Sequence, residues 1–189
     1  FTMVGNSSSG KSTLAVQAVA NMVDFVNSYW PGTSEMIFFD VERYFSIERI
    51  KNITGWTDTD VYNKLVLYQE DKTNVLDIYN EIRRICDLKE KNQKSLNIKT
   101  PLFNLDGTEH YQYAPTFIII DSIAMLSSVP EFSYDKAGNI KIDEEISKNT
   151  EAMTDAKNNT NFIKKVKPLC NKYGLVLMMI NHITNEIKI

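Results

Sequence analysis

Three short stretches of the sequence are apolar at every position, and they constrain the fold more than any other feature. They comprise residues 36–39, 117–120 and 175–180. Each has the length of a β-strand, and none alternates between apolar and polar residues. A strand that is apolar on both faces is typical of a parallel sheet with helices packed on each side. The segments between these strands are therefore expected to supply helices.

The connecting segments show the spacing that such helices require. Apolar residues recur every three or four positions over residues 12–29 and 75–86, and a further helix is expected over 151–173. Pro168 should kink or split that last helix. Shorter elements are expected elsewhere: strands at 2–4 and 65–68, and a helix at 47–54. The sequence thus predicts an α/β fold with a mostly parallel central sheet flanked by helices on both faces.

With 189 residues, the chain has the length of one domain. Two polar stretches interrupt the pattern, and connections of their length are usually functional or mobile. The first, residues 89–115, carries turn signals at Pro101 and at Asp106-Gly107, and we expect it to be an insertion. The second is residues 127–150. Because the chain begins with Phe1 directly before an expected strand, we expect a core that is incomplete at both ends.

Composition excludes several classes of protein. The net charge of −3 argues against a basic nucleic-acid coat, although a local basic site stays open. No apolar run approaches the roughly 20 residues of a membrane helix, so no membrane association is expected. Cys86 and Cys170 lie on apolar helix faces and are expected to be buried thiols in a reducing compartment. Of the two histidines, His182 has no metal-ligand partners spaced near it in the sequence, so we expect no metal cage.

The residues between the first expected strand and the first expected helix match the pattern G-x-x-x-x-G-K-[ST]. They are Gly5, Asn6, Ser7, Ser8, Ser9, Gly10, Lys11 and Ser12. In such a loop, backbone N–H groups surround phosphate oxygens, and the dipole of the following helix favours the anion. Lys11 would contact the outer phosphates, Ser12 would bind Mg²⁺, and Thr13 would support the helix start and the base of the nucleotide. The motif predicts binding of ATP with Mg²⁺; a chance serine-glycine turn is the alternative.

Two acidic motifs follow expected strands. Asp121 follows residues 117–120 and can hold Mg²⁺ through its water shell, or simply cap a turn. Ser122 can bond the same shell or cap the same turn. Glu42 lies just beyond residues 36–39, where a carboxylate can accept a proton from water attacking the γ-phosphate. Asp40 is expected to be a supporting or structural acid, and the alternative for the pair is a solvated turn.

Asn181 and His182 follow the last expected strand. A polar side chain at that point can contact the γ-phosphate and report its presence to the next segment. The alternative is a pair of loop residues that bond to backbone groups.

The order of these motifs along the chain is more specific than any one of them. The chain contains the 5–12 motif, Phe39-Asp40-Val41-Glu42, Ile120-Asp121-Ser122-Ile123-Ala124-Met125-Leu126, Met153-Thr154-Asp155-Ala156-Lys157 with Pro168 beyond it, and Ile180-Asn181-His182. This set resembles the RecA-like recombinases, and most closely the strand-exchange recombinases of tailed bacteriophages (the UvsX type). The resemblance covers nearly the whole chain except residues 89–115, and it implies a P-loop NTPase core of the RecA type.

The resemblance implies a DNA-dependent ATPase that forms a filament on single-stranded DNA and promotes homologous pairing and strand exchange. Glu42 would be the general base, and Asn181 and His182 would form the nucleotide sensor that leads into a DNA-binding loop after His182. Residues 127–150 would hold a mobile DNA-binding loop. The setting would be phage recombination and repair in the bacterial cytoplasm of an infected cell, with single-strand-binding and mediator proteins as further partners. The alternatives are a hexameric replicative helicase of the same superfamily and a non-catalytic ATP-binding recombination mediator.

The chain departs from the family pattern at two places. Where the family often has an aromatic residue that stacks on adenine, this sequence has Arg49, with Tyr44 and Phe45 nearer to Glu42. An arginine side chain can stack on a base as well. The 127–150 stretch contains Lys136, Lys141 and Lys148 but also Asp135, Asp143, Glu144 and Glu145.

Overall fold

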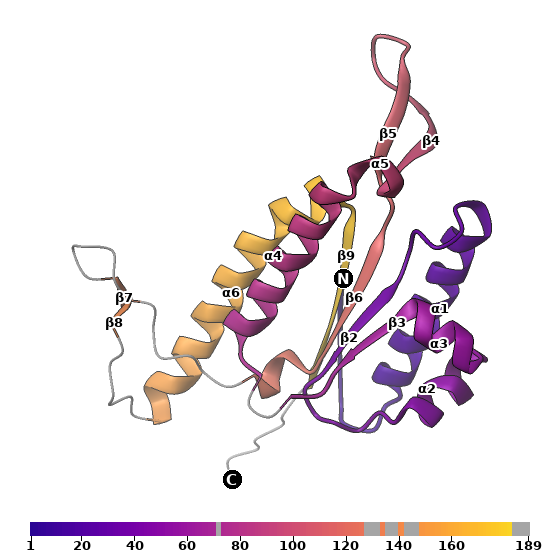
Figure 1. Cartoon of the computed structure of the whole chain (residues 1–189). Helices are drawn as coiled ribbons and strands as arrows, with labels where there is room; N and C mark the ends of the chain where they lie inside the picture. The colour runs from indigo at the N-terminus through magenta and orange to yellow at the C-terminus, as the bar shows by residue number, and fades with distance from the viewer. Residues whose placement is uncertain (71–72, 127–132, 135–139, 142–147, 183–189) are drawn as a thin grey trace.

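The chain folds as three layers, with a parallel β-sheet between two layers of helices (Figure 1). This computed structural model describes residues 1–70, 73–126, 133–134, 140–141 and 148–182. The five strands of the central sheet lie in the order β1 (Thr2–Gly5), β9 (Leu175–His182), β6 (Thr116–Asp121), β2 (Met36–Asp40) and β3 (Leu65–Tyr68). All neighbouring pairs in this sheet are parallel, which confirms the predicted sheet.

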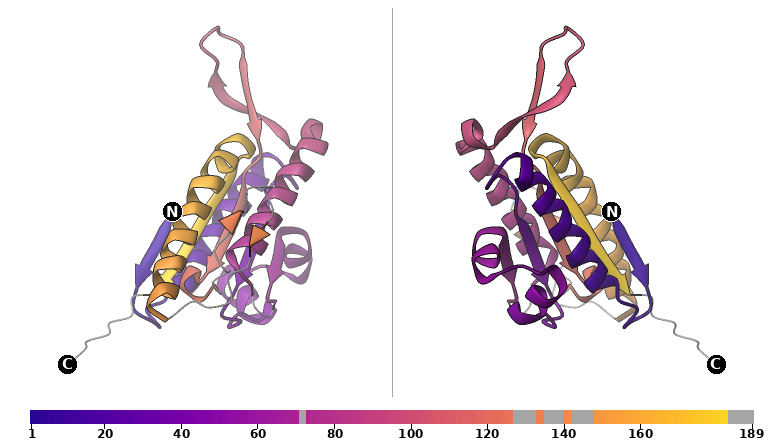
Figure 2. Two further views of the ribbon diagram at one scale, coloured as in Figure 1. Left: turned by 90° about the vertical axis from the view of Figure 1, so that its left-hand side faces the viewer. Right: turned by 90° about the vertical axis from the view of Figure 1, so that its right-hand side faces the viewer.

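Helices cover both faces of the sheet, as predicted. One face carries α1 (Lys11–Tyr29), α2 (Ile47–Thr54) and α3 (Asp58–Lys64), and the other carries α4 (Val75–Lys91) and α6 (Lys148–Tyr173) (Figures 1 and 2). The core under α1 includes Val16, Val19, Phe38 and Ile119. The core under α4 and α6 includes Ile78, Ile82, Ile118 and Phe162. Since each such side chain contributes about 1.5–3 kcal/mol when buried, these two cores hold the strand ends in a fixed arrangement.

Two helices differ from the sequence prediction. α3 was not predicted because it buries none of its residues and so has no apolar periodicity; a capping box between Thr57 and Asp60 starts it. α6 runs from Lys148 to Tyr173 as one helix, so Pro168 does not split it, and a kink at Pro168 stays a prediction. Packing of Phe162 and Val166 against the sheet offsets the backbone hydrogen bond that a proline removes. No helix among the described residues is long and apolar enough to cross a membrane.

The polar stretch 89–115 forms regular secondary structure, although its sequence shows no apolar periodicity. It contains the end of α4, the one-turn helix α5 (Gln93–Leu96), and a hairpin of β4 (Asn97–Phe103) and β5 (Glu109–Tyr113). Gly107 closes the hairpin turn at φ +80°, in agreement with the predicted turn signal. The hairpin projects from the end of the sheet where β6 begins (Figure 1), so it lies away from the carboxyl ends of the strands.

The predicted DNA-binding stretch 127–150 falls largely outside the described residues. Within it, β7 (Ser133–Tyr134) pairs antiparallel with β8 (Ile140–Lys141), and α6 begins at Lys148. Upstream, the 3₁₀-helix η1 (Ile123–Met125) follows β6 directly.

Candidate functional site

The alternation of side chains along the strands brings several predicted residues to one edge of the sheet. Residues two apart on a strand point to the same face, and partners in register on neighbouring strands do so too. The core under α1 receives residues from three adjacent strands, and the last from each strand are Phe38, Ile119 and Ile180. Two positions further along the same strands are Asp40, Asp121 and His182. These three polar residues therefore share the face covered by α1, at the carboxyl ends of their strands.

The 5–12 loop joins this edge from β1. Gly5 is in register with His182, so the loop begins beside the last residue of β9. Gly10 is the N-cap of α1 at φ +81°, a backbone conformation that strains any residue with a Cβ atom. Thr13, in the first turn of α1, is half-buried. The predicted order of strand, loop and helix is confirmed, with the first N–H groups of α1 directed at the loop.

Lys11 folds back over this loop. Its ammonium group donates hydrogen bonds to the carbonyl oxygens of Gly5 at 2.9 Å and Asn6 at 2.6 Å. It lies 3.4 Å from the hydroxyl of Ser9 and 3.5 Å from Nδ1 of His182. The lysine is thus at the centre of the loop, where a bound phosphate would replace these weak acceptors with charged ones.

His182 connects Lys11 to Glu42. While Nδ1 faces the ammonium group, Nε2 lies 2.9 Å from Oε1 of Glu42. This second contact is an ion pair when the ring is protonated, but it is not aligned as a hydrogen bond, and Nε2 has no hydrogen-bond partner among the described residues. Three residues from separate sequence motifs therefore meet at the edge of the sheet.

Asp121 lies beneath this line of residues and is 3 % exposed. The hydroxyl of Ser12 faces this carboxylate, yet Oδ1 has no hydrogen-bond partner among the described residues. Burial raises the pKa of this carboxyl, the negative charges of Glu42 and Asp40 raise it further, and the Ser12 hydroxyl opposes the shift. A cation held between Ser12 and Asp121 would relieve this unfavourable burial of charge, so the two residues fit the predicted Mg²⁺ site.

Asp40 holds the loop that carries Glu42. Its carboxylate accepts hydrogen bonds from the backbone N–H groups of Tyr44 at 3.3 Å and Phe45 at 2.9 Å, and from the side-chain amide of Gln69 at 2.6 Å. The interpretation of Asp40 as a structural acid agrees with these bonds. Gln69 was missed by sequence reasoning, because its role depends on β3 lying beside β2 and no sequence pattern indicates that pairing.

The backbone of β6 fixes the other side of the Glu42 loop. The carbonyl oxygen of Asp121 accepts hydrogen bonds from the N–H groups of Val41 at 2.7 Å and Glu42 at 3.3 Å. The loop is therefore tied to the strand that carries Asp121 as well as to the strand that precedes it. This double attachment sets where the Glu42 carboxylate lies relative to Asp121.

Asn181 has the opposite orientation to its neighbour. It pairs with Val4 of β1 and lies between Ile180 and His182, so strand alternation directs its side chain to the face covered by α6. Of the two residues predicted to sense the nucleotide, the structure brings only His182 to the face with Lys11. The role of Asn181 stays a prediction.

The three candidates for stacking on a nucleotide base, Tyr44, Phe45 and Arg49, differ in how far their side chains are exposed. Phe45 is buried and packs edge-on against Phe38, so its ring faces the core. Arg49 lies over the outer side of the Phe45 ring, with the guanidinium carbon 4.4 Å from the ring centroid. Tyr44 is exposed. The structure therefore leaves Tyr44 and Arg49 as the candidates.

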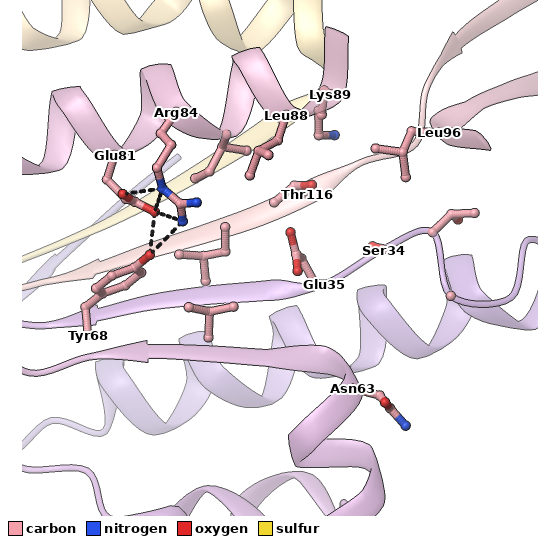
Figure 3. Close-up of a pocket in the computed structure, with 15 residues that line it drawn as sticks. Ser34, Glu35, Asn63, Tyr68, Glu81, Arg84, Leu88, Lys89, Leu96 and Thr116 are labelled. Carbon is pink, nitrogen blue, oxygen red and sulfur yellow. Dashed lines mark hydrogen bonds and ion pairs between the residues drawn. The ribbon is translucent and has the colours of Figure 1, made fainter. Parts of the chain in front are cut away.

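A hollow of a different character extends from the amino ends of β2, β3 and β6 as far as Tyr68 (Figure 3). Its volume is about 240 Å³, and its charged side chains are those of Glu35, Glu81, Arg84 and Lys89. Hydroxyl groups come from Thr33, Ser34, Tyr68 and Thr116. Arg84 forms an ion pair with Glu81, which also bonds to Tyr68, while Lys89 donates to the carbonyl oxygen of Ala114. Because these groups largely bond within the protein, the hollow does not point to a ligand.

Comparison with known proteins does not assign a family. Neither a scan against protein-family models nor a search of curated proteins finds a match. The case for a function therefore rests on the geometry at the carboxyl edge of the sheet and on the motifs that meet there.

Proposed function

We propose that this protein binds ATP with Mg²⁺ at the carboxyl edge of its sheet and hydrolyses it, with Glu42 as the general base. The observation that carries the proposal is the contact between motifs that are far apart in sequence: Lys11 faces His182, and His182 faces Glu42. If residues 5–12 were only a chance serine-glycine turn, their position beside the acidic residues at the ends of two strands would be unexplained.

Each residue has a role that its surroundings support. The ammonium group of Lys11 and the N–H groups at the start of α1 would hold the β- and γ-phosphates. Ser12 and Asp121 would hold the Mg²⁺, whose charge offsets that developing on the phosphates. Asp121 is well suited to this role because its buried Oδ1 has no other partner among the described residues.

Glu42 is placed for proton transfer from water. Its backbone is fixed by Asp121 and, through the bonds of Asp40, by the neighbouring loop. Its carboxylate lies at the edge of the site and is partly exposed, so water can reach it. The contact with His182 orients the carboxylate toward the residues that would surround the γ-phosphate. General-base catalysis of this kind contributes about 10²–10⁴-fold to a rate.

We extend the proposal to DNA on the basis of connectivity and the resemblance described above. The two segments expected to contact DNA are continuous with strands that end in the site: residues 127–150 follow Asp121 through η1, and residues beyond 182 follow His182. A change at the γ-phosphate would therefore act directly on both segments. The proposed activity is an ATP-dependent recombinase that assembles on single-stranded DNA.

The hydrolysis proposal is tested by Glu42→Gln, which keeps the shape of the side chain and removes the base. We expect ATP affinity within about threefold of the wild type and a turnover number reduced by about 10²–10⁴-fold. Glu48→Gln is the matched control, because Glu48 is exposed and pairs only with Lys51 among the described residues. Unchanged turnover in Glu42→Gln would exclude Glu42 as the base.

The DNA proposal is tested with the full-length protein in two assays. We expect single-stranded DNA to stimulate ATP hydrolysis and the protein to exchange strands between homologous duplexes. Unwinding of a forked duplex without strand exchange would favour a helicase instead. ATP binding with no hydrolysis under either condition would favour a recombination mediator.

A further inference from the structure

Glu42, Asp121 and His182 together present three metal-ligand atoms at one point. One carboxylate oxygen from each acid and one ring nitrogen of the histidine all lie within 4.8 Å of one another. They come from three adjacent strands, at the end of β6, at the end of β9 and in the loop after β2. The sequence argued against a metal here because no ligands are spaced near His182, but this spacing rule does not apply to ligands that parallel strands bring together.

A second observation indicates that these atoms are suited to an ion. Oδ1 of Asp121 and Nε2 of His182 are both buried, and neither has a hydrogen-bond partner among the described residues. Asp121 as a whole is 3 % exposed. Leaving the buried Oδ1 of Asp121 without a hydrogen bond costs about 1–3 kcal/mol. Nε2 of His182 has only the unaligned contact with Glu42. A cation bound to these atoms would satisfy them.

The distances are close to those of a coordinated ion. Two ligands of one tetrahedral zinc ion lie about 3.4 Å apart, given metal–ligand bonds of about 2.0–2.2 Å. The contact between His182 and Glu42 is already shorter than this, at 2.9 Å. Since no pair of ligand atoms is wider than 4.8 Å, at most about 1.4 Å of closure is needed to reach that spacing. Part of this closure can come from rotation of the Glu42 side chain, which is only partly buried.

The ligand set selects the kind of ion. Mg²⁺ prefers oxygen ligands and retains most of its water, whereas an imidazole nitrogen with two carboxylates suits Zn²⁺, Co²⁺ or Mn²⁺. We propose that Glu42, Asp121 and His182 form a binding site for such a transition-metal ion, distinct from the Mg²⁺ that would accompany ATP. The ion binds to the protein directly and without nucleotide.

The proposed site has a consequence for hydrolysis, and this consequence rests on the proposed function. A Glu42 carboxylate bound to a metal ion cannot accept a proton from water. Asp121 would also be shared between this ion and the Mg²⁺ of the nucleotide complex. Occupancy by Zn²⁺ therefore inhibits the enzyme, and ATP with Mg²⁺ competes with the transition metal for the site.

The test is a titration of the nucleotide-free, full-length protein with Co²⁺, followed by its visible absorption. We expect saturable binding of one ion per chain, displacement by Zn²⁺, and at least a tenfold loss of affinity in His182→Asn. His110→Asn is the matched control: the His110 ring bonds to Thr100 in the distant hairpin, so Co²⁺ affinity should be unchanged. Circular dichroism of each variant verifies that it is folded.

Two further outcomes complete the test. Glu42→Gln should also weaken Co²⁺ binding, which separates this site from one formed by His182 alone. Equal Co²⁺ affinity in the wild type and in folded His182→Asn would overturn the proposal. Because no ATP is present, the metal site and the hydrolysis proposal can fail independently: Co²⁺ binding with no ATPase activity leaves the site standing and refutes only the enzyme.

Discussion

The two ends of the central sheet both contain buried charged groups, but they use them differently. At the amino end, the buried ammonium group of Lys89 donates a hydrogen bond to the backbone carbonyl oxygen of Ala114. At the carboxyl end, buried atoms of Asp121 and His182 have no hydrogen-bond partner among the described residues. Both ends carry the cost of burying polar groups, yet only one offsets that cost within the protein.

This difference teaches how a functional edge can be recognised. Charges that bond to their own neighbours stabilise the fold and leave no group to bind a ligand. Charges that converge without partners lower stability, and they persist where a ligand supplies the missing bonds. Figure 3 shows the hollow near the amino end of the sheet, but we expect the ligand to bind at the other end.

Asp121→Asn should produce the largest contrast between the two ends. Because the substitution removes a buried negative charge that lacks a full set of partners, we expect the free energy of unfolding to rise by about 1 kcal/mol. Turnover of ATP with Mg²⁺ should fall by about 100-fold or more, because the ligand for the ion is lost. Chemical denaturation and a hydrolysis assay measure the two effects. A variant that is less stable and fully active would show that Asp121 is a structural residue.

Lys89→Met tests whether a buried ammonium group at the amino end of the sheet makes the free energy of unfolding depend on pH. Burial lowers the pKa of Lys89 to about 8, against the partial compensation of Glu35 and Cys86. Between pH 8 and the ordinary pKa of lysine the unfolded chain binds more protons than the folded one, so wild-type stability rises with pH in this window. Relative to Lys89→Met, the wild type should gain on the order of 2 kcal/mol from pH 7 to pH 9.5.

The exposed Lys91→Met variant is the control for that measurement, since it removes a lysine from the same helix without changing a buried charge. Its difference from the wild type should stay constant across the same pH range. A pH-independent difference for Lys89→Met as well would mean that the Lys89 ammonium group is not buried in solution.

Phe103→Ser should have the smallest effect. Phe103 is exposed at the end of β4, in the hairpin that projects from the amino end of the sheet (Figure 2). We expect a change in unfolding free energy below about 0.5 kcal/mol and no change in ATP turnover. A marked loss of turnover would connect the hairpin to the carboxyl edge and remove the contrast between the two ends.

The sequence was sufficient for the elements that have a strong local pattern. Strands such as β6 are apolar throughout, and α1 follows a motif with a fixed spacing, so both could be located in advance. The hairpin of β4 and β5 could not, because its strands are mostly exposed and polar and therefore lack an apolar alternation. The same reason hides α3, which buries no residue.

The candidate site was predictable as a set of residues but not as a set of contacts. Lys11, Glu42 and Asp121 were found from their motifs. The contact of His182 with both Lys11 and Glu42 depends on β9 lying between β1 and β6, which no local pattern specifies. Strand alternation directs the side chains of Asn181 and His182 to opposite faces of the sheet. The sequence could not show this difference, because both residues were expected to lie in a loop after the strand and not inside β9.

The central claim is that ATP binds at the carboxyl edge of the sheet. Calorimetric titration of the wild type, Lys11→Ala and Lys89→Met with ATP and Mg²⁺ tests it most directly, because the two variants remove one ammonium group from each end. We predict that Lys11→Ala weakens binding by about 100-fold, through the loss of charge-assisted bonds to phosphate, and that Lys89→Met binds as the wild type does. Undiminished binding in Lys11→Ala would contradict the account.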